Sequence, residues 1–585
     1  MKRFTGALAC LLFFLTATFG TLVSPVQAAI STTPDPTGSP TQAADTSNAS
    51  GAEGGCFTTN AWHETENYLI YHMIRVDEQN MILPWYDPSN LCNSYDHMLH
   101  LVFEWWLNME RNPAEPDLPY YLMHQIWQST SEPDYDPKGL GGDQLAMAIS
   151  SWTLYYAYTG DTRALDDMVL IANHVLDNGM SPATDLWPNL PYPYNVTRLD
   201  KMDGDMIFHE NFTMLDKAGS FGYELVNLYK ITGNTRYLQA AVKIANTLAN
   251  HTQAGDEVTS PLPYRVNTKT GELPVGGNPY TTYWTGLLML WEGLEGLGQG
   301  NIADYQTAHT KVLNWLRTYP VHNNQWGPFF EDGPGWSITQ TNAVTLAMYI
   351  MDHRDLWGPT WQADARSALD WPYAALDNLG WIDYGVELID EQTGYRKPGN
   401  SHNSRQASME LRYAELTGDT SRVTNSVRQL SWATYSVDFD GKNRYPYDNI
   451  WLTDGYGDYV RHYLRAMAAA PWLAPDDQDH LLRTSSIIKF IRYQPDRIEY
   501  RTFDGSAQEK LKITSFMPLS VTANGVPLQR LNSISDLETQ TGFTLGAPGD
   551  LPTVMRIHHE NATSIVISGV PPKYLFLPLI QQIPQ

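Results

Sequence analysis

Acidic residues recur just before segments with a helical pattern, set among glycine or aromatic residues. The five that stand out are Asp143, Glu210, Asp332, Asp454 and Asp458. Hydrolysis of a glycosidic bond requires two carboxyl groups on opposite sides of that bond, one protonated and one ionised. These five residues are therefore the candidate catalytic acids.

Asp454 and Asp458 form the strongest single cluster. They lie four residues apart at the expected start of a helix, so their carboxylates would share one face. Gly455 and Gly457 lie beside them and leave room for a ligand to approach. This spacing indicates a site at the end of that helix.

Structural roles compete with this interpretation. Asp143 and Asp454 are well placed to cap a helix, because a short carboxylate at the first position accepts free backbone N–H groups. Asp458 has Arg461 and His462 on the next turn, and pairing with either is the alternative to catalysis.

Glu210 and Glu331 are poorer helix caps than aspartate, and both lie among aromatic residues. Such surroundings would raise a carboxyl pKa by desolvation, as a general acid requires. The side chains expected to bind substrate around the acids are His209, Trp284, Trp336, His402, Arg405 and Tyr456.

The segment 399–405 reads Gly-Asn-Ser-His-Asn-Ser-Arg and places His402 and Arg405 in the first turns of a helix. The helix macrodipole disfavours cations there, so a carboxylate or an anionic ligand is expected to compensate. With Asn403 and Tyr395, these residues are the types with which a polysaccharide lyase or uronate epimerase moves a proton and neutralises a carboxylate. A lyase or epimerase is thus the main alternative to a hydrolase, and a non-catalytic glycan-binding protein is the third hypothesis.

Three similar turns divide the chain, at Thr159-Gly160-Asp161, Thr232-Gly233-Asn234 and Thr417-Gly418-Asp419. Each joins two amphipathic helical patterns, with glycine suited to a left-handed C-terminal position and Asp or Asn suited to the start of the next helix. With two less regular joints at Gly298–Asn301 and Asp352–Asp355, such joints recur about every 55 to 75 residues, which fits a helical hairpin plus a long connecting loop.

The turns predict six helical hairpins. First helices are expected near Asp143–Tyr158, Lys217–Ile231, Tyr283–Gly296, Thr339–Met351, Asn403–Leu416 and Gly455–Ala470. Their partners are expected near Thr162–Asp177, Thr235–His251, Ile302–Tyr319, Trp361–Trp371 and Ser421–Thr434. The sixth helix needs a partner from Trp62–Val76 or Ser94–Arg111. If the first helices run parallel as an inner ring, the long aromatic loops before them bring the candidate residues to one mouth.

From about Arg483 the pattern changes to short alternating segments. The expected strands are Ile487–Tyr493, Arg497–Thr502, Lys510–Ser515, Ser520–Ala523, Thr541–Leu545, Val554–His559 and Ser564–Ser568. This spacing predicts a β-sandwich domain over 476–585, after a helical domain over 56–475. The β domain is expected to pack on the ring without supplying catalytic acids.

The hairpin spacing, the Thr-Gly-Asp/Asn turns, the aromatic loops and the β appendage together resemble the (α/α)6 six-hairpin glycosidases and polysaccharide lyases. The resemblance covers roughly Trp62 to Ser568. It implies a mainly α fold, an (α/α)6 toroid with a C-terminal β-sandwich, and carbohydrate chemistry without a particular substrate.

The N-terminus has the layout of a cleavable signal peptide over residues 1–28, with Lys2 and Arg3, an apolar run and small residues before Ala28. Residues 29–55 have the composition of a disordered linker. Processing would leave Cys56 and Cys92, an even pair that we expect to form a disulfide in a secreted protein.

The chain has 38 Lys+Arg against 64 Asp+Glu, a net charge of −26. This charge argues against nucleic-acid and membrane partners and disfavours a highly anionic polymer, unless a local cationic cleft overrules it. A carbohydrate is the expected partner, and no cofactor is expected. A structural calcium ion at Asp438–Asn443 is a weaker hypothesis than a solvated turn, because the spacing differs from that of an EF-hand.

Overall fold

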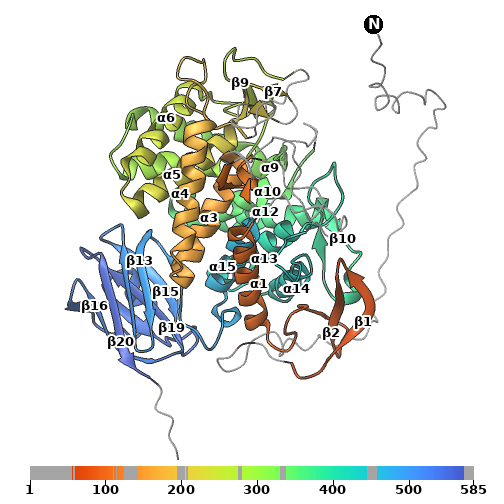
Figure 1. The fold of residues 1–585 in the computed structure, drawn as a ribbon, viewed down its shortest axis with the longest axis vertical. Coiled ribbons are helices and arrows are strands. Elements are labelled where there is room, and N and C mark those ends of the chain that lie inside the picture. The colour runs from red at the N-terminus through yellow and green to blue at the C-terminus, as the bar shows by residue number, and fades with distance from the viewer. Residues whose placement is uncertain are drawn as a thin grey trace, which may run out of the picture. The chain divides into compact units, whose positions relative to one another are not determined.

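The computed structural model describes residues 56, 59–109, 111–112, 115–123, 142–193, 204–205, 208–274, 280–329, 337–444 and 457–571. Within these residues, the helical part and the β-rich C-terminal part belong to one compact unit. Figure 1 shows the β region at the end of the helical part away from β7 and β9. None of the helices in the described ranges is long and apolar enough to cross a membrane.

The predicted hairpin turns are present. Gly160, Gly233 and Gly418 end their helices with φ of 75°, 75° and 77°, the left-handed region that glycine adopts at least cost. The following Asp or Asn side chain accepts a backbone N–H two residues on in each case, as Asn234 does from Arg236 at 3.1 Å. The local chemistry of these turns therefore fixes where the hairpins bend.

Six helices form a closed inner ring, as predicted. They are α3 (Gly142–Thr159), α5 (Leu215–Thr232), α7 (Thr285–Gly296), α10 (Gln340–Asp352), α13 (Asn400–Thr417) and α15 (Asp458–Ala469). Each packs on the next in chain order, and α15 packs back on α3, so the ring closes.

Neighbouring inner helices run parallel and can approach closely. A Cβ added to Gly219 would lie 2.7 Å from the Cβ of Leu287, and one added to Gly286 would lie 2.3 Å from the Oγ of Ser220. Further along, Gly222 faces Leu290 and keeps the same offset, so α5 and α7 point the same way. Side chains in the first turns of the ring therefore face one end of it.

The outer helices complete the hairpins. They are α4 (Arg163–Asn178), α6 (Thr235–His251), α8 (Ile302–Thr318), α12 (Trp361–Ala375) and α14 (Val423–Thr434). Helix α1 (Leu91–Leu107) packs on α15 and α14 and so supplies the missing sixth partner. Trp62–Val76, the other segment considered for this role, forms the strands β1 (Trp62–Leu69) and β2 (His72–Asp77) instead, and along β2 buried and half-buried residues alternate.

Short elements occupy the connections. They are β3 (Ile82–Leu83), β4 (Arg111–Asn112), β5 (Glu115–Pro119), α2 (Tyr120–Met123), β6 (Gly204–Asp205), β7 (His209–Glu210), β8 (Phe212–Met214), β9 (Arg265–Asn267), α9 (Pro320–Asn323), α11 (Arg354–Trp357), β10 (Asp377–Asn378), η2 (Ile382–Tyr384), β11 (Leu388–Ile389) and η3 (Pro471–Leu473).

The C-terminal region contains two antiparallel sheets. One has the order β12-β15-β19-β18 and the other β13-β14-β20-β16-β17. The strands are β12 (His480–Thr484), β13 (Ile488–Gln494), β14 (Arg497–Thr502), β15 (Ala507–Lys512), β16 (Met517–Ala523), β17 (Val526–Pro527), β18 (Gly542–Leu545), β19 (Val554–His559) and β20 (Ser564–Val570), with the turn η4 (Ser535–Glu538). The first strand, β12, was not anticipated from the sequence.

This β region packs on the C-terminal ends of inner helices. The Tyr493 hydroxyl donates to the carbonyl of Ala157 in α3 at 2.6 Å, and Lys510 Nζ donates to the carbonyl of Ala468 in α15 at 2.9 Å. The first turns of the inner helices therefore lie at the opposite end of the ring.

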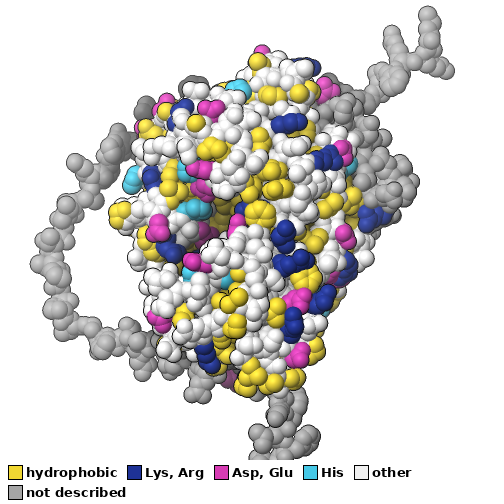
Figure 2. All heavy atoms as spheres, turned by 90° about the vertical axis from the view of Figure 1, so that its left-hand side faces the viewer, with side chains coloured by type: hydrophobic (Ala, Val, Ile, Leu, Met, Phe, Trp, Pro, Cys, Tyr) yellow, Lys and Arg dark blue, Asp and Glu magenta, His cyan; other side chains and the backbone are white. Residues whose placement is uncertain are grey.

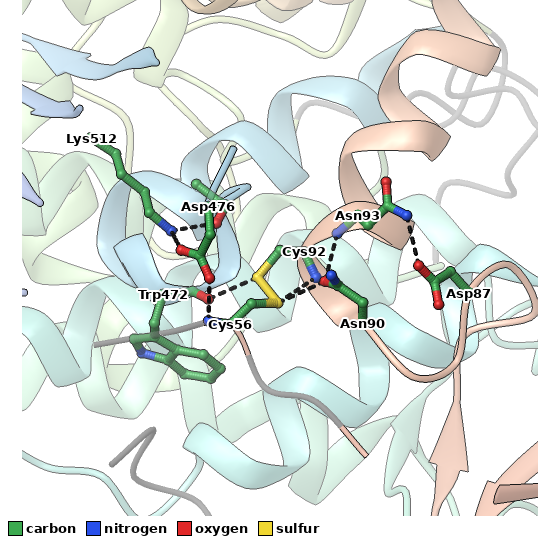
Figure 3. The surroundings of a disulfide bond; sticks show 9 residues. Cys56, Asp87, Asn90, Cys92, Asn93, Trp472, Asp476 and Lys512 are labelled. Atoms are coloured by element: carbon green, nitrogen blue, oxygen red, sulfur yellow. Dashed lines mark hydrogen bonds and ion pairs between the residues drawn. A yellow bond between two sulfur atoms is a disulfide. The ribbon is translucent and has the colours of Figure 1, made fainter. Parts of the chain in front are cut away.

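Cys56 and Cys92 form the predicted disulfide, which ties the start of the described chain to the first turn of α1 (Figure 3). In the same region, Asn90 caps α1 by accepting the N–H of Asn93 at 3.1 Å, and Asp476 accepts the N–H of Cys56 at 2.6 Å. The bridge thus lies beside the point where the chain leaves the ring for the β region.

We expect the double variant Cys56→Ser/Cys92→Ser to lower the free energy of unfolding by about 2–4 kcal/mol, because it releases a covalent loop in the unfolded chain. Urea denaturation of the oxidised wild type and the variant would measure the difference. Reduced wild type is the control and should match the variant. Equal stability of oxidised and reduced wild type would contradict the prediction.

Candidate functional site

A cavity of about 1210 Å³ follows the axis of the ring, and we call it the lumen. At the end formed by the first turns of the inner helices it is lined by Lys217, Tyr283, Arg405 and Arg461. At the other end it reaches Lys510 and other residues of the β region. Figure 2 shows acidic and histidine side chains around a recess at the height where the ring meets the β region.

Asp458 is fully buried at the start of α15 and holds several groups together. Its carboxylate accepts from Arg405 Nη2 at 2.5 Å and from His462 Nε2 at 2.9 Å, and it pairs with Arg461. Burial alone would raise the pKa of Asp458, but the charges of Arg461, His462 and Arg405 hold it well below its usual range. Asp458 therefore stays ionised. Its pairing with Arg461 and His462 is the structural role that the sequence offered as the alternative to catalysis.

Arg405 joins three inner helices. Besides Asp458 on α15, its guanidinium donates to Thr341 Oγ1 at 2.9 Å and to Gln340 Oε1 at 3.2 Å, both in the first turn of α10. The carboxylate that was expected to compensate a cation in the first turns of α13 is thus Asp458. Of the predicted site residues whose side chains are described, Arg405 lines the lumen.

His402 and Asn403 serve the packing of α13. His402 is buried, and burial together with the charge of Arg405 lowers the pKa of its ring well below the ordinary value. Asn403 bonds the backbone of Ile389 through both ends of its amide, at 3.0 Å each. Tyr395 is 37% exposed on a connecting segment and is not among the lumen residues. The residues proposed for lyase chemistry therefore do not converge on the lumen, apart from Arg405.

Lys217 lies on α5 at the same end of the lumen. Its ammonium pairs with Asp216 at 3.1 Å and donates to the carbonyl of Phe329 at 3.0 Å. It also lies over the ring of Phe329, 3.6 Å from the centroid, and 5.0 Å from that of Tyr283. This buried cation is thus enclosed by aromatic faces.

Glu224 is the acid that sequence analysis missed. It projects from the third turn of α5, lines the lumen and is only 7% exposed. Asn227 donates to its carboxyl group at 3.2 Å, and no ion pair joins Glu224 to any residue in the described ranges. Burial raises the pKa of Glu224 to about 7 despite that hydrogen bond. The sequence signal for this site was a single acidic residue in the middle of an otherwise largely apolar helical segment.

Two other predicted residues lie away from the lumen. Glu210 is exposed on β7, which pairs with β6, and Trp284 is fully buried at the start of α7 as part of the core. Neither lines the lumen, so the prediction that all candidate residues line one cavity is wrong for these two, for His402 and for Asp458.

The remaining candidates lie, at least in their side chains, outside the described part of the structure. Asp143 and His209 lie in α3 and β7, but their side chains are outside the described part of the structure. Glu331 and four predicted site residues lie outside the described residues altogether: Asp332, Trp336, Asp454 and Tyr456. They stay predictions.

The segment considered for calcium uses its carboxylates in ion pairs. Asp438 pairs with Arg444 at 2.8 Å, and Asp440 pairs with Lys442 at 3.3 Å. Asp438 also accepts the backbone N–H of Phe439 at 2.8 Å, as expected of a turn.

No protein-family model matches this chain, and no curated protein matches it either. Among solved structures, a cellobiose 2-epimerase from Spirochaeta thermophila is similar at 12% identity and a TM-score of 0.49, over 65% of this chain and 97% of that one. A family 76 glycoside hydrolase from Bacteroides thetaiotaomicron matches at 13% identity and a TM-score of 0.44, over 64% and 77% of the two chains. A D-mannose isomerase matches at 9% identity and a TM-score of 0.47, over 64% and 97%.

Proposed function

We propose that this chain is a carbohydrate-processing enzyme, and more narrowly a glycoside hydrolase that binds a saccharide in the lumen of its helical ring. The observation that supports this proposal is the position of Glu224 in the lumen, together with its raised pKa. Its carboxyl group faces a cavity large enough for sugar rings, and its pKa of about 7 keeps much of it protonated near neutral pH. A protonated carboxyl group beside a sugar is what a glycosidase uses to assist the leaving group.

The second carboxyl group of such a pair has to remain ionised and reach the substrate. Asp458 is ionised but fully buried and not among the lumen residues, so we assign it as a positioning residue for Arg405 and Arg461. The sequence candidates for the second carboxyl group are Asp143, Asp332 and Asp454, which precede or begin inner helices. Replacing each of these three aspartates in turn by asparagine and measuring turnover would identify the one that acts.

A lyase or uronate epimerase is the second candidate. Tyr283 lines the lumen with Arg405 and Arg461, and a tyrosine beside cations is the kind of group that abstracts a proton next to a uronate. Burial, however, raises the pKa of Tyr283 above its ordinary value, so even less of it is present at neutral pH as the phenolate that would act as the base. We therefore rank this candidate below hydrolysis.

Secretion also belongs to the proposal. The N-terminal order of charged, apolar and small residues and the Cys56–Cys92 disulfide both support it.

We expect the purified protein to release reducing ends from at least one polysaccharide without a rise in ultraviolet absorbance. A panel of neutral and acidic polysaccharides, assayed for both signals, would test this. A lyase would instead create a double bond that absorbs in the ultraviolet, and a binding protein would produce neither signal. Heat-denatured protein is the control for contaminating sugars.

A further inference from the structure

Arg461 and Arg465 lie one helical turn apart on α15, and both line the lumen. Arg461 pairs with Asp458, and its Nε has no hydrogen-bond partner among the described residues. Arg465 forms no hydrogen bond or ion pair with any residue in the described ranges. Two guanidinium groups at this spacing repel each other unless an anion lies between or beside them.

The acidic groups around these arginines are already engaged. Asp458 is shared by Arg405, Arg461 and His462. Asp352, which also lines the lumen, pairs with Arg412 at 3.3 Å.

Glu224 is the remaining acid close enough to influence both arginines, and it is not fully ionised near neutral pH. Burial, followed by the charge of Arg461, lowers the pKa of Arg465 to about 10. Among the described residues at this level of the lumen, the carboxylates thus do not fully neutralise the basic groups.

We propose that Arg461 and Arg465 bind an acidic substituent of the saccharide, a carboxylate or a sulfate ester, so that the substrate is an anionic glycan. This inference rests on the proposed function, because it assigns the ligand of the same lumen. The planar guanidinium donates two parallel hydrogen bonds to either oxyanion, and a site screened from bulk water strengthens them. The lumen is therefore the local cationic cleft that overrules the net charge of −26.

The test compares wild type with Arg465→Gln, Arg465→Lys and Arg236→Gln by calorimetric binding. Arg236 is an exposed arginine on α6, so its variant changes the net charge equally without touching the lumen. The probes are oligosaccharides from polygalacturonate, alginate and hyaluronan with their methyl esters, and sulfated galactan fragments with their desulfated forms. Reducing-end release is measured on the same probes, together with neutral cello- and manno-oligosaccharides.

We expect wild type to bind an acidic probe and to lose roughly 10- to 100-fold in affinity when that probe is esterified or desulfated. Arg465→Gln should lose a similar factor on the acidic probe and almost nothing on its neutral counterpart. Arg465→Lys should retain part of the affinity, and Arg236→Gln all of it. The esters and the desulfated forms show whether carboxylate or sulfate is the bound group.

Turnover of neutral probes alone, or an acidic affinity unchanged in Arg465→Gln, would overturn this inference and leave hydrolysis standing. Arg465-dependent binding of an acidic probe without cleavage of any probe would support the anion site and overturn hydrolysis. If wild type neither bound nor cleaved any of the probes, the anion site and the proposed hydrolysis would both be overturned.

Discussion

Asp458→Asn is expected to lower the free energy of unfolding by about 3–5 kcal/mol, as found when one partner of a buried charge network is removed. The carboxylate is fully buried and compensates Arg405 and Arg461, while His462 donates to it. An amide has no charge to offset the two guanidinium groups, and they would stay buried. Urea denaturation followed by circular dichroism would measure the loss.

The matched control is Asp177→Asn. Asp177 also pairs with an arginine, Arg236, but both side chains are largely exposed, at 58% and 41%. Exposed pairs contribute about 0–1 kcal/mol, so this variant should be nearly as stable as wild type. If both variants lost the same small amount, Asp458 would not be the structural centre of the cluster, and a direct catalytic role would regain support.

The hairpins were predictable because their signals are local. A turn such as Thr232-Gly233-Asn234 contains both the left-handed glycine that ends one helix and the cap that begins the next. The side-chain pattern on either side then gives the helix period, and the six inner helices begin within a few residues of the predicted positions. Closure of the ring followed from the number of hairpins, with α1 supplying the sixth partner.

The site was less predictable because its contacts are distant in sequence. Arg405 and Asp458 are separated by 53 residues, and neither residue type alone indicates that they meet. Glu224 and Arg465 were missed for a different reason. A polar residue inside a helix normally faces solvent, and it faces a lumen here because the ring closes around it. That surface exists only after tertiary assembly.

The same limit explains two misjudged residues. Trp284 was expected to stack on a sugar, yet it lies in the core, where large aromatic side chains bury most area. Glu210 was expected among desolvating aromatics, yet it is exposed on β7. Residue type and proximity to a helix start do not determine which way a side chain points.

Glu224→Gln is expected to lower turnover by about 10²–10⁴-fold on the best saccharide substrate, the scale of losing a general acid. The amide keeps the shape of the carboxyl group and can still accept from Asn227, but it has no acidic proton to donate to a leaving group. Initial rates of reducing-end release over a range of pH would measure the effect. Glu295→Gln, on the exposed face of α7, is the matched control and should retain full turnover.

The pH dependence separates catalysis by Glu224 from a merely structural role. Because its folded-state pKa is raised to about 7, wild-type activity should fall as pH rises through that value, when the acid loses its proton. The free energy of unfolding should change in the same direction. The protonated carboxyl group is the form that the folded protein favours, so its contribution to stability is fully present below the ordinary glutamate pKa and is lost as pH rises through about 7. Glu224→Gln has no such titration, so its low residual turnover should not fall as pH rises through about 7, and the variant should be more stable than wild type at pH 8. Normal turnover in Glu224→Gln would move the general acid to another carboxyl group, with Asp332 and Asp454 the first to replace.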